Sequence, residues 1–275
     1  MKYGFVKVAA AIPQVKVADC KFNAQQIDTL IAIADGKGVQ IVVFPELCIT
    51  GYTCADLFGH SLLLEEAEMA LMQIMNNTRQ MDIISIVGMP ISMNSMLMNC
   101  AVVIQRGKIL GIVPKTYLPN YKEFYEQRWF ASSINLSDNT IHLCGQTVPF
   151  GSNMLFDTSD TCFGIEICED VWAPIPPSSS LALKGAEIIF NLSADNESIG
   201  KYFFATLVQF FTIWYKRKGF DGTCQYRFTW IDKFCSGMYG FFIGIMSYVC
   251  RKSGVCSSFV ADAFYIYFAD NQLFL

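Results

Sequence analysis

The sequence contains few histidines and no apolar run long enough to cross a membrane. His60 and His142 are the only histidines, and neither lies in a Cys/His cluster with zinc-site spacing. A histidine-based zinc centre or a Ser-His-Asp triad would need one of these isolated residues, so both are disfavoured. The apolar stretches of the C-terminal part have about 13 residues or fewer, below the roughly 18–20 that span a bilayer. We therefore expect no metal site and no membrane partner.

Paired-cysteine motifs and a positive charge balance are also missing. The 11 cysteines are scattered, odd in number and without a Cys-x-x-Cys pair, which favours a reducing compartment over a disulfide framework. Met1-Lys2-Tyr3 leads directly into an apolar strand, without the regions of a signal peptide. A cytoplasmic location is therefore expected. The net charge of -4 disfavours nucleic acid as the main partner.

Proline and glutamate are absent from the C-terminal part of the chain. Residues 202–275 contain neither but hold 22 aromatic residues, whereas residues 1–201 contain all nine prolines and all ten glutamates. Such an aromatic content is far from ordinary usage in soluble proteins. The composition predicts two parts, a domain at residues 1–201 and an aromatic-rich tail at residues 202–275.

Hydrophobic patterning in residues 1–201 predicts strands interleaved with helices. Helices are expected at residues 22–36, with Gly36 as the C-cap glycine, at 61–79, and from 180–184. Strands are expected at residues 4–12, 40–44, 83–89, 98–105, 108–113, 153–157, 161–167 and 187–192, with a hairpin turn at 105–108. This interleaving predicts an α/β fold, with a mixed sheet and helices outside it.

Three of these strands end in residues that can carry chemistry. Cys168 ends one, Glu46 follows another, and Lys115 follows a third. A single cysteine at a strand end is most often a small buried hydrophobe, and Glu46 and Lys115 taken alone could be a solvated ion pair. Cys168 differs because carboxylates surround it in the sequence, at Glu166, Glu169 and Asp170. A thiol presented at a strand end, next to charge, is typical of a nucleophile.

An activated thiolate at Cys168 needs a cation and a base. Carboxylates alone raise the pKa of a thiol, so Lys115 is the expected cation. Because no histidine is suitably placed, Glu46 is the expected general base. Lys115 would also donate to a tetrahedral oxyanion, together with a backbone N–H that follows Cys168. The residues alone thus indicate an α/β enzyme with a cysteine nucleophile.

Four motifs that occur in order carry a resemblance to a known family. They are Pro45-Glu46-Leu47 continuing to Gly51-Tyr52 and Asp56-Leu57-Phe58, then Lys115-Thr116-Tyr117-Leu118-Pro119 continuing to Arg128-Trp129-Phe130, then Glu166-Ile167-Cys168-Glu169-Asp170-Val171-Trp172, and finally Asn191-Leu192-Ser193-Ala194. Over residues 1 to about 201 the chain resembles the nitrilase, or carbon–nitrogen hydrolase, superfamily. More narrowly, it is similar to the glutaminase domain of glutamine-dependent NAD⁺ synthetases. The resemblance implies an α-β-β-α sandwich, truncated here after about residue 201.

The resemblance also implies a reaction and a set of site residues. Cys168 would attack the side-chain amide of glutamine, ammonia would leave, and water would hydrolyse the glutamyl thioester. Glu46 would be base and then acid, and Lys115 the oxyanion stabiliser. Glu126 is the candidate for the superfamily's additional glutamate, with Glu123 close by. The positions that match the family's glutamine pocket are Tyr52, Tyr121, Phe124 and Glu169, with Asp195 and Lys201 in the substrate-gripping segment.

In that family the glutaminase step needs no cofactor, and the enzymes assemble into homo-oligomers. Ammonia passes to a second domain, which uses ATP and Mg²⁺ to amidate nicotinic acid adenine dinucleotide to NAD⁺. The present chain contains no Ser-Gly-Gly-x-Asp-Ser phosphate loop, so we expect that domain to be absent from it.

Residues after Lys201 do not match the family, and this leaves alternatives open for the tail and for the whole chain. Our hypothesis is that residues from about 202 are a frameshifted translation of the family's own coding DNA, which resequencing across codon 202 would test. The basic run at residues 216–218 favours, less strongly, a membrane-surface anchor. The chain could then be an inactive truncated fragment, while residues 1–201 also fit a stand-alone amidase that acts on another small amide.

Overall fold

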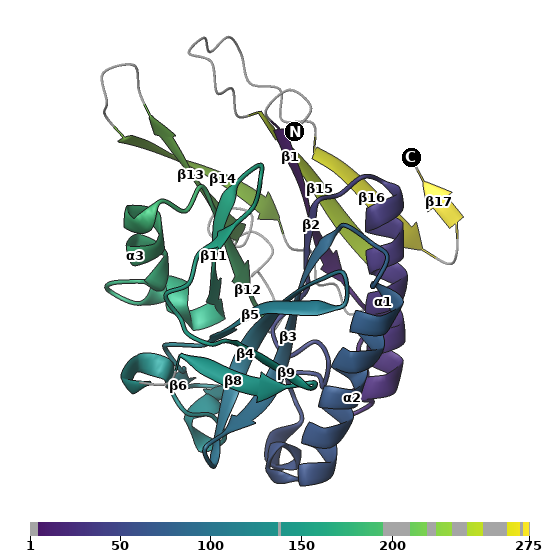
Figure 1. The fold of residues 1–275 in the computed structure, drawn as a ribbon, viewed down its shortest axis with the longest axis vertical. Coiled ribbons are helices and arrows are strands. Elements are labelled where there is room, and N and C mark those ends of the chain that lie inside the picture. The colour runs from purple at the N-terminus through teal and green to yellow at the C-terminus, as the bar shows by residue number, and fades with distance from the viewer. Residues whose placement is uncertain are drawn as a thin grey trace.

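The structure of the chain is a computed structural model. It describes residues 5–136 and 139–194, together with the backbone of five strands at residues 210–218, 224–232, 241–249, 263–269 and 272–274. Two sheets lie face to face, with helices covering the outer face of each (Figure 1). This arrangement is the α-β-β-α sandwich that the sequence predicts.

The larger sheet is mixed, and its strand order is β17-β16-β15-β1-β2-β3-β4-β5. Its strands are β1 (Phe5–Ile12), β2 (Ile41–Val43), β3 (Ile84–Met93), β4 (Met96–Gln105), β5 (Lys108–Pro114), β15 (Phe241–Val249), β16 (Ala263–Ala269) and β17 (Gln272–Phe274). Strands β1, β2 and β3 run parallel, and the other neighbours are antiparallel.

A smaller sheet supplies the second layer of the sandwich. It contains β10 (Phe156–Asp157), β11 (Cys162–Ile167) and β12 (Ile188–Leu192), with β11 parallel to β12. Helices α1 (Cys20–Gly36) and α2 (Ser61–Asn77) lie side by side on the larger sheet, and α3 (Pro177–Lys184) covers the smaller one (Figure 1).

The side-chain alternation of the central strands creates the layers. Along β1, Val8 and Ala10 belong to the core between the two sheets, whereas Ala9 and Ala11 belong to the core beneath α1 and α2. The inward residues of β11 and β12 complete the inter-sheet core. Because successive strand residues point to opposite faces, an all-apolar strand is what a sheet covered on both sides requires.

The helices begin and end close to the predicted boundaries. The side chain of Asp19 accepts a hydrogen bond from the Phe22 N–H and caps the N-terminus of α1. At the other end the prediction was wrong in detail. Gly36 is the last helical residue, and the glycine with positive φ is Gly38 (φ 69°). Helix α3 begins at Pro177, earlier than predicted, because proline fits the first turn of a helix.

Two hairpins were not predicted from the sequence. The β3–β4 turn at Asn94-Ser95 and the turn at Cys144-Gly145 between β8 (Thr140–Leu143) and β9 (Gln146–Pro149) place non-glycine residues at positive φ. The predicted turn, at Arg106-Gly107, carries the expected glycine and is confirmed. A hairpin signal that relies on glycine therefore misses the Asn94-Ser95 turn, whereas Cys144-Gly145 has the same pattern as the predicted turn.

The described part of the tail is all strand. β13 (Phe210–Lys218) pairs with β14 (Cys224–Asp232), and β15 pairs antiparallel with β1. Strands of the tail thus continue the larger sheet past the expected truncation, while the predicted domain boundary near residue 201 and the frameshift hypothesis stay predictions. Within the described residues, no helix has both the length and the apolar character to cross a membrane.

Candidate active site

The three predicted chemical residues each follow the end of a different strand. Glu46 follows β2, Lys115 follows β5, and Cys168 follows β11 of the facing sheet. Gly88 on β3 allows the Glu46 loop to come close: a Cβ there would lie 2.4 Å from the Leu47 nitrogen and 2.5 Å from the Pro45 oxygen. Close backbone approach of this kind requires glycine.

Lys115 lies between two buried carboxylates. Its Nζ donates to Glu46 Oε1 at 2.6 Å and to Glu126 Oε1 at 2.7 Å. The Lys115 and Glu46 side chains have no exposed surface, and that of Glu126 is 2% exposed. Glu126 opens the short helical turn η2 (Glu126–Arg128), and it, rather than the exposed Glu123, joins this network. A buried lysine with two carboxylates is stable only where further hydrogen bonds satisfy the charges.

Three neutral groups complete that network. The Asn99 amide donates to Glu46 Oε1 at 2.7 Å, and the Tyr52 hydroxyl donates to Glu126 Oε1 at 2.8 Å. The Ala194 N–H donates to Glu46 Oε2 at 3.0 Å. We call Glu46, Lys115, Glu126 and Asn99 the carboxylate–lysine network. It is closed to solvent and faces the nucleophile position.

Cys168 adopts a left-handed backbone conformation, with φ 45°. Its N–H donates to Asn191 Oδ1 at 3.1 Å, and its carbonyl accepts from Asn191 Nδ2 at 3.4 Å. The Ser193 hydroxyl donates to the same Oδ1 at 2.7 Å. A non-glycine residue in this region is strained and persists only where its surroundings hold it. The Asn191 amide does so here by gripping the Cys168 peptide groups.

The electrostatics assign different protonation states to the thiol and the amine. Burial, the charges of Glu46 and Glu126, and only partial compensation by Lys115 raise the pKa of the Cys168 thiol well above its usual value. Burial lowers the pKa of Lys115, but attraction to Glu46, Cys168 and Glu126 outweighs this and raises it. Lys115 therefore stays protonated and cannot be the base, while the resting thiol needs a base to remove its proton.

Glu126 differs from an ordinary carboxylate. Burial and the neighbouring charge of Glu46 raise its pKa to about 7, against the opposing effect of Lys115. A carboxyl group that titrates near neutrality can hold or release a proton during a reaction.

Two of the carboxylates next to Cys168 support the backbone. Glu166 accepts from the Ser178 N–H at the start of α3 at 3.0 Å. Asp170 accepts from the backbone N–H groups of Thr116, Tyr117 and Ile167 at 3.1, 2.7 and 3.0 Å, and it thereby ties the Lys115 segment to the end of β11. Their charge therefore does not mark the nucleophile as directly as the sequence interpretation held.

The residues expected to form the substrate pocket lie together. The Tyr121 hydroxyl donates to Glu169 Oε2 at 2.9 Å. The Phe124 ring contacts the rings of Tyr121 and Tyr52 edge-on, with centroids 6.2 and 6.4 Å apart. Tyr52 continues to Glu126, so these four residues run from the surface to the carboxylate–lysine network. Asp195 and Lys201, the other two expected substrate residues, lie outside the described residues.

Comparison with known proteins decides the family. The profile of the family described as carbon-nitrogen hydrolase matches residues 7–208. The chain belongs to the carbon–nitrogen hydrolase family. It is 37% identical over 203 residues to the glutamine-dependent NAD(+) synthetase of Mycobacterium tuberculosis, covering 73% of this chain and 30% of that relative. It is also 37% identical over 205 residues to the enzyme of that name from Rattus norvegicus, covering 71% and 28%.

Solved structures agree with this carbon–nitrogen hydrolase assignment. A glutamine-dependent NAD(+) synthetase from Cytophaga hutchinsonii superposes with a TM-score of 0.64 at 29% identity, covering 74% of this chain and 33% of that one. An amidase from Nesterenkonia sp. superposes with a TM-score of 0.55 at 17% identity, covering 70% and 66%, which shows a common fold. The chain spans about 30% of the length of the curated relatives it matches.

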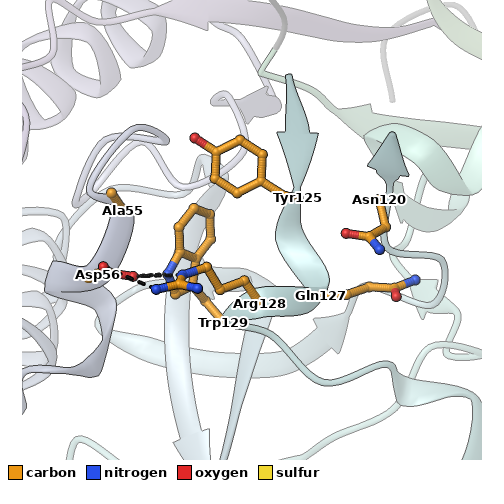
Figure 2. A pocket seen from close by; sticks show the side chains of 7 residues that line it. All are labelled: Ala55, Asp56, Asn120, Tyr125, Gln127, Arg128 and Trp129. Carbon is orange, nitrogen blue, oxygen red and sulfur yellow. Dashed lines mark hydrogen bonds and ion pairs between the residues drawn. The ribbon is translucent and has the colours of Figure 1, made fainter. Parts of the chain in front are cut away.

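A cavity of about 840 Å³ lies on the outer side of η2 (Figure 2). Tyr125, Arg128 and Trp129 line it, with Arg128 and Trp129 both donating to Asp56. Cys168 is not among its lining residues. Glu126 in the same turn is buried and does not line this cavity, so η2 borders both the candidate active site and the outer cavity.

Sequence reasoning missed several residues that shape the candidate site of this carbon–nitrogen hydrolase. They are Asn99, the gripping role of Asn191, the backbone role of Asp170 and the close approach at Gly88. Asn99 had a usable signal, since asparagine is disfavoured in strands and here begins the apolar run Cys100-Ala101-Val102-Val103-Ile104. The other three depend on contacts between distant segments.

Proposed function

We propose that the chain hydrolyses the side-chain amide of glutamine, with Cys168 as nucleophile. The observation that carries this proposal is the buried Lys115 ammonium held between Glu46 and Glu126, electrostatically coupled to the Cys168 thiol. The relatives named as glutamine-dependent support the choice of glutamine among amides.

In the first half-reaction Glu46 removes the thiol proton while Sγ attacks the amide carbon, and a C–S bond forms. Because the thiol's pKa is raised, proton removal and attack have to be coupled. Lys115 stabilises the negative charge that develops on the amide oxygen. The Cys168 N–H is already bonded to Asn191, so the second oxyanion donor is proposed to be the following backbone N–H. Collapse breaks the C–N bond, and protonated Glu46 gives its proton to the leaving ammonia.

In the second half-reaction water hydrolyses the glutamyl thioester. Glu46 is again ionised and takes a proton from the water as it attacks the thioester carbon. Collapse then breaks the C–S bond, Glu46 returns the proton to the Cys168 sulfur, and glutamate is released. Glu126 accepts hydrogen bonds from Lys115 and Tyr52. Its role is to keep the ammonium aimed toward the thiol in both steps. The hydrolysis requires no cofactor.

The substrate would lie against Tyr52, Tyr121, Phe124 and Glu169. The aromatic rings provide an apolar wall, and the half-buried Glu169 carboxylate offers an acceptor for an α-ammonium group. Asp195 and Lys201 are proposed to bind the remaining polar groups of glutamine.

The ammonia is proposed to serve NAD⁺ formation in the cytoplasm. The relatives' common name supports an acceptor activated with ATP and Mg²⁺, nicotinic acid adenine dinucleotide, and a synthetase domain in the length of the relatives that this chain does not cover. Assembly into a homo-oligomer is part of the same proposal. The cysteines of the described part are free, which supports a reducing compartment.

Ammonia release from glutamine tests the proposal. Purified wild-type protein should release ammonia from glutamine, and Cys168→Ala should abolish the release. Cys162→Ala is the matched control, since Cys162 begins β11, the strand that ends just before Cys168, and is similarly half-buried. Release from other small amides but not from glutamine would replace the proposal with a stand-alone amidase. No release from any amide would identify an inactive fragment.

A further inference from the structure

Asn99 contacts all three charged residues of the carboxylate–lysine network, Glu46, Lys115 and Glu126. It lies on β4, is 1% exposed, and donates through Nδ2 to Glu46 Oε1 at 2.7 Å and to Glu126 Oε2 at 3.4 Å. Its backbone carbonyl accepts the Lys115 N–H at 2.8 Å. One residue therefore ties both carboxylates and the lysine to strand β4 of the larger sheet.

The Asn99 amide is held by these carboxylates alone. Among the described residues its Oδ1 is buried and has no hydrogen-bond partner. A reversed amide would place Oδ1 against two carboxylate oxygens, so the negative charges fix Nδ2 toward them. An unpaired buried acceptor is unfavourable for folding. The position of Asn99 is better explained by the hydrogen bonds that its Nδ2 donates to the two carboxylates.

The two oxygens of Glu46 are consequently unequal. Oε1 accepts from both Lys115 and Asn99, which uses its two lone-pair directions. Within the part of the chain that the structure describes, Oε2 accepts from the Ala194 N–H alone and retains one direction. The Ala194 carbonyl oxygen lies 4.0 Å from Cys168 Sγ, so the residue that holds Oε2 also borders the thiol.

We propose that Asn99 is a positioning residue that saturates Glu46 Oε1, so that Oε2 is the atom that takes the Cys168 proton and later returns it to the leaving ammonia. The proposal rests on the proposed function for its reaction but not for its geometry. Among the described residues, the ionisable groups that face Glu46 are Lys115 after β5, Glu126 on η2, Cys168 at the start of the turn η4 (Cys168–Trp172), and Tyr52 in the loop before the turn η1 (Ala55–Gly59).

Asn99→Ala and Asn99→Asp test the proposal through the pH profile. Loss of a donor to the charged form raises a carboxyl pKa, so the acid limb of kcat/KM should move upward by about one pH unit in Asn99→Ala. It should move further in the isosteric Asn99→Asp, which adds a third carboxylate. We expect kcat to fall about 10- to 100-fold, the cost of a hydrogen bond to a charged group, while KM changes little.

Ser85→Ala is the matched control. Ser85 is a buried polar residue on the neighbouring β3 whose Oγ has no partner among the described residues, and it does not contact the carboxylates. The pH profile of kcat/KM in Ser85→Ala should match that of the wild type. A fall in activity of the Asn99 variants with an unchanged acid limb would overturn the proposal, because a merely structural role lowers the amplitude alone.

Two further readouts do not depend on turnover. The pH dependence of Cys168 alkylation by iodoacetamide, followed by peptide mass spectrometry, should show the same upward shift in Asn99→Ala. That shift in a protein that hydrolyses no amide would retain this proposal and reject the proposed function. In the wild-type protein the Asn99 side-chain amide resonance should titrate with the midpoint of the acid limb. A resonance that does not respond to pH would overturn the proposal even if both variants failed to fold.

Discussion

The turn η2 carries two carboxylate–cation pairs of similar length on opposite sides. Glu126 meets Lys115 at 2.7 Å inside the protein, and Arg128 meets Asp56 at 2.9 Å outside it (Figure 2). The first pair is 0% and 2% exposed, whereas the second is 61% and 73% exposed. The distances are nearly equal, so distance does not separate the two.

The two ion pairs differ in burial, and burial changes the pKa of the carboxyl group in each pair. On the outside, hydrogen bonds from Arg128 and Trp129 lower the pKa of Asp56 to about 2, and the pair behaves as ordinary surface charge. On the inside, burial raises the pKa of Glu126 to about 7. Only the inner pair can change protonation near neutral pH, and only it lies beside a thiol that needs proton transfer.

Replacing the cation of each pair with methionine should produce the largest difference in stability and activity between the inner and the outer pair. Lys115→Met leaves two buried carboxylates uncompensated, which should cost about 3–5 kcal/mol of unfolding free energy and about 10²–10³-fold in kcat. Arg128→Met should leave both quantities close to wild type, because exposed pairs contribute little. Urea unfolding and ammonia release measure both. Equal losses in the two variants would refute the distinction.

Asp170→Ala should have the next largest effect. It removes the acceptor of three backbone N–H groups that join the Lys115 segment to the end of β11. Loss of these charge-assisted bonds should lower the unfolding free energy by about 2–4 kcal/mol. Asp82→Ala, at an exposed ion pair with Arg106, is the control. An Asp170 variant as stable as this control would show that the carboxylate does not hold the segment.

Gly88→Ala should reduce activity more than stability. The new Cβ would collide with the backbone of the Glu46 loop, and displacement of a catalytic group by about 1 Å can cost about 10²-fold in rate. Gly36→Ala is the control, because nothing lies within 4 Å of that position and alanine favours helices. Steady-state kinetics of the folded variants would decide. Unchanged kcat in Gly88→Ala would mean that the loop position is not critical.

The pH dependence of stability should report the buried carboxyl groups alone. Burial raises the pKa of both Glu126 and Asp170 to about 7, above the value of about 4 in unfolded chains. The folded state therefore binds more protons in this window, and stability should fall as pH rises from about 4 to about 7. Glu126→Gln should flatten that slope. A slope of opposite sign in the wild type would contradict these shifts.

Local signals in the sequence, apolar strands and their polar ends, predicted a mixed sheet with helices outside it and the strand-end positions of Glu46, Lys115 and Cys168, while the family resemblance implied the α-β-β-α sandwich. Local signals could not predict that Asp170 binds the Thr116 and Tyr117 N–H groups, since these lie 54 and 53 residues away in the chain. The same holds for Gly88, which differs from other glycines only through the loop that packs on it. The hairpin at Asn94-Ser95 escaped because neither turn residue is glycine.

Trapping the covalent intermediate tests the central claim most directly. Wild-type protein and Cys168→Ala would be mixed with glutamine, quenched in acid, digested and examined by mass spectrometry. The account predicts a γ-glutamyl thioester on the wild-type peptide that contains Cys168, and none on the Cys162 peptide or in the variant. Release of ammonia from glutamine without any adduct at Cys168, or with equal rates in Cys168→Ala, would contradict it.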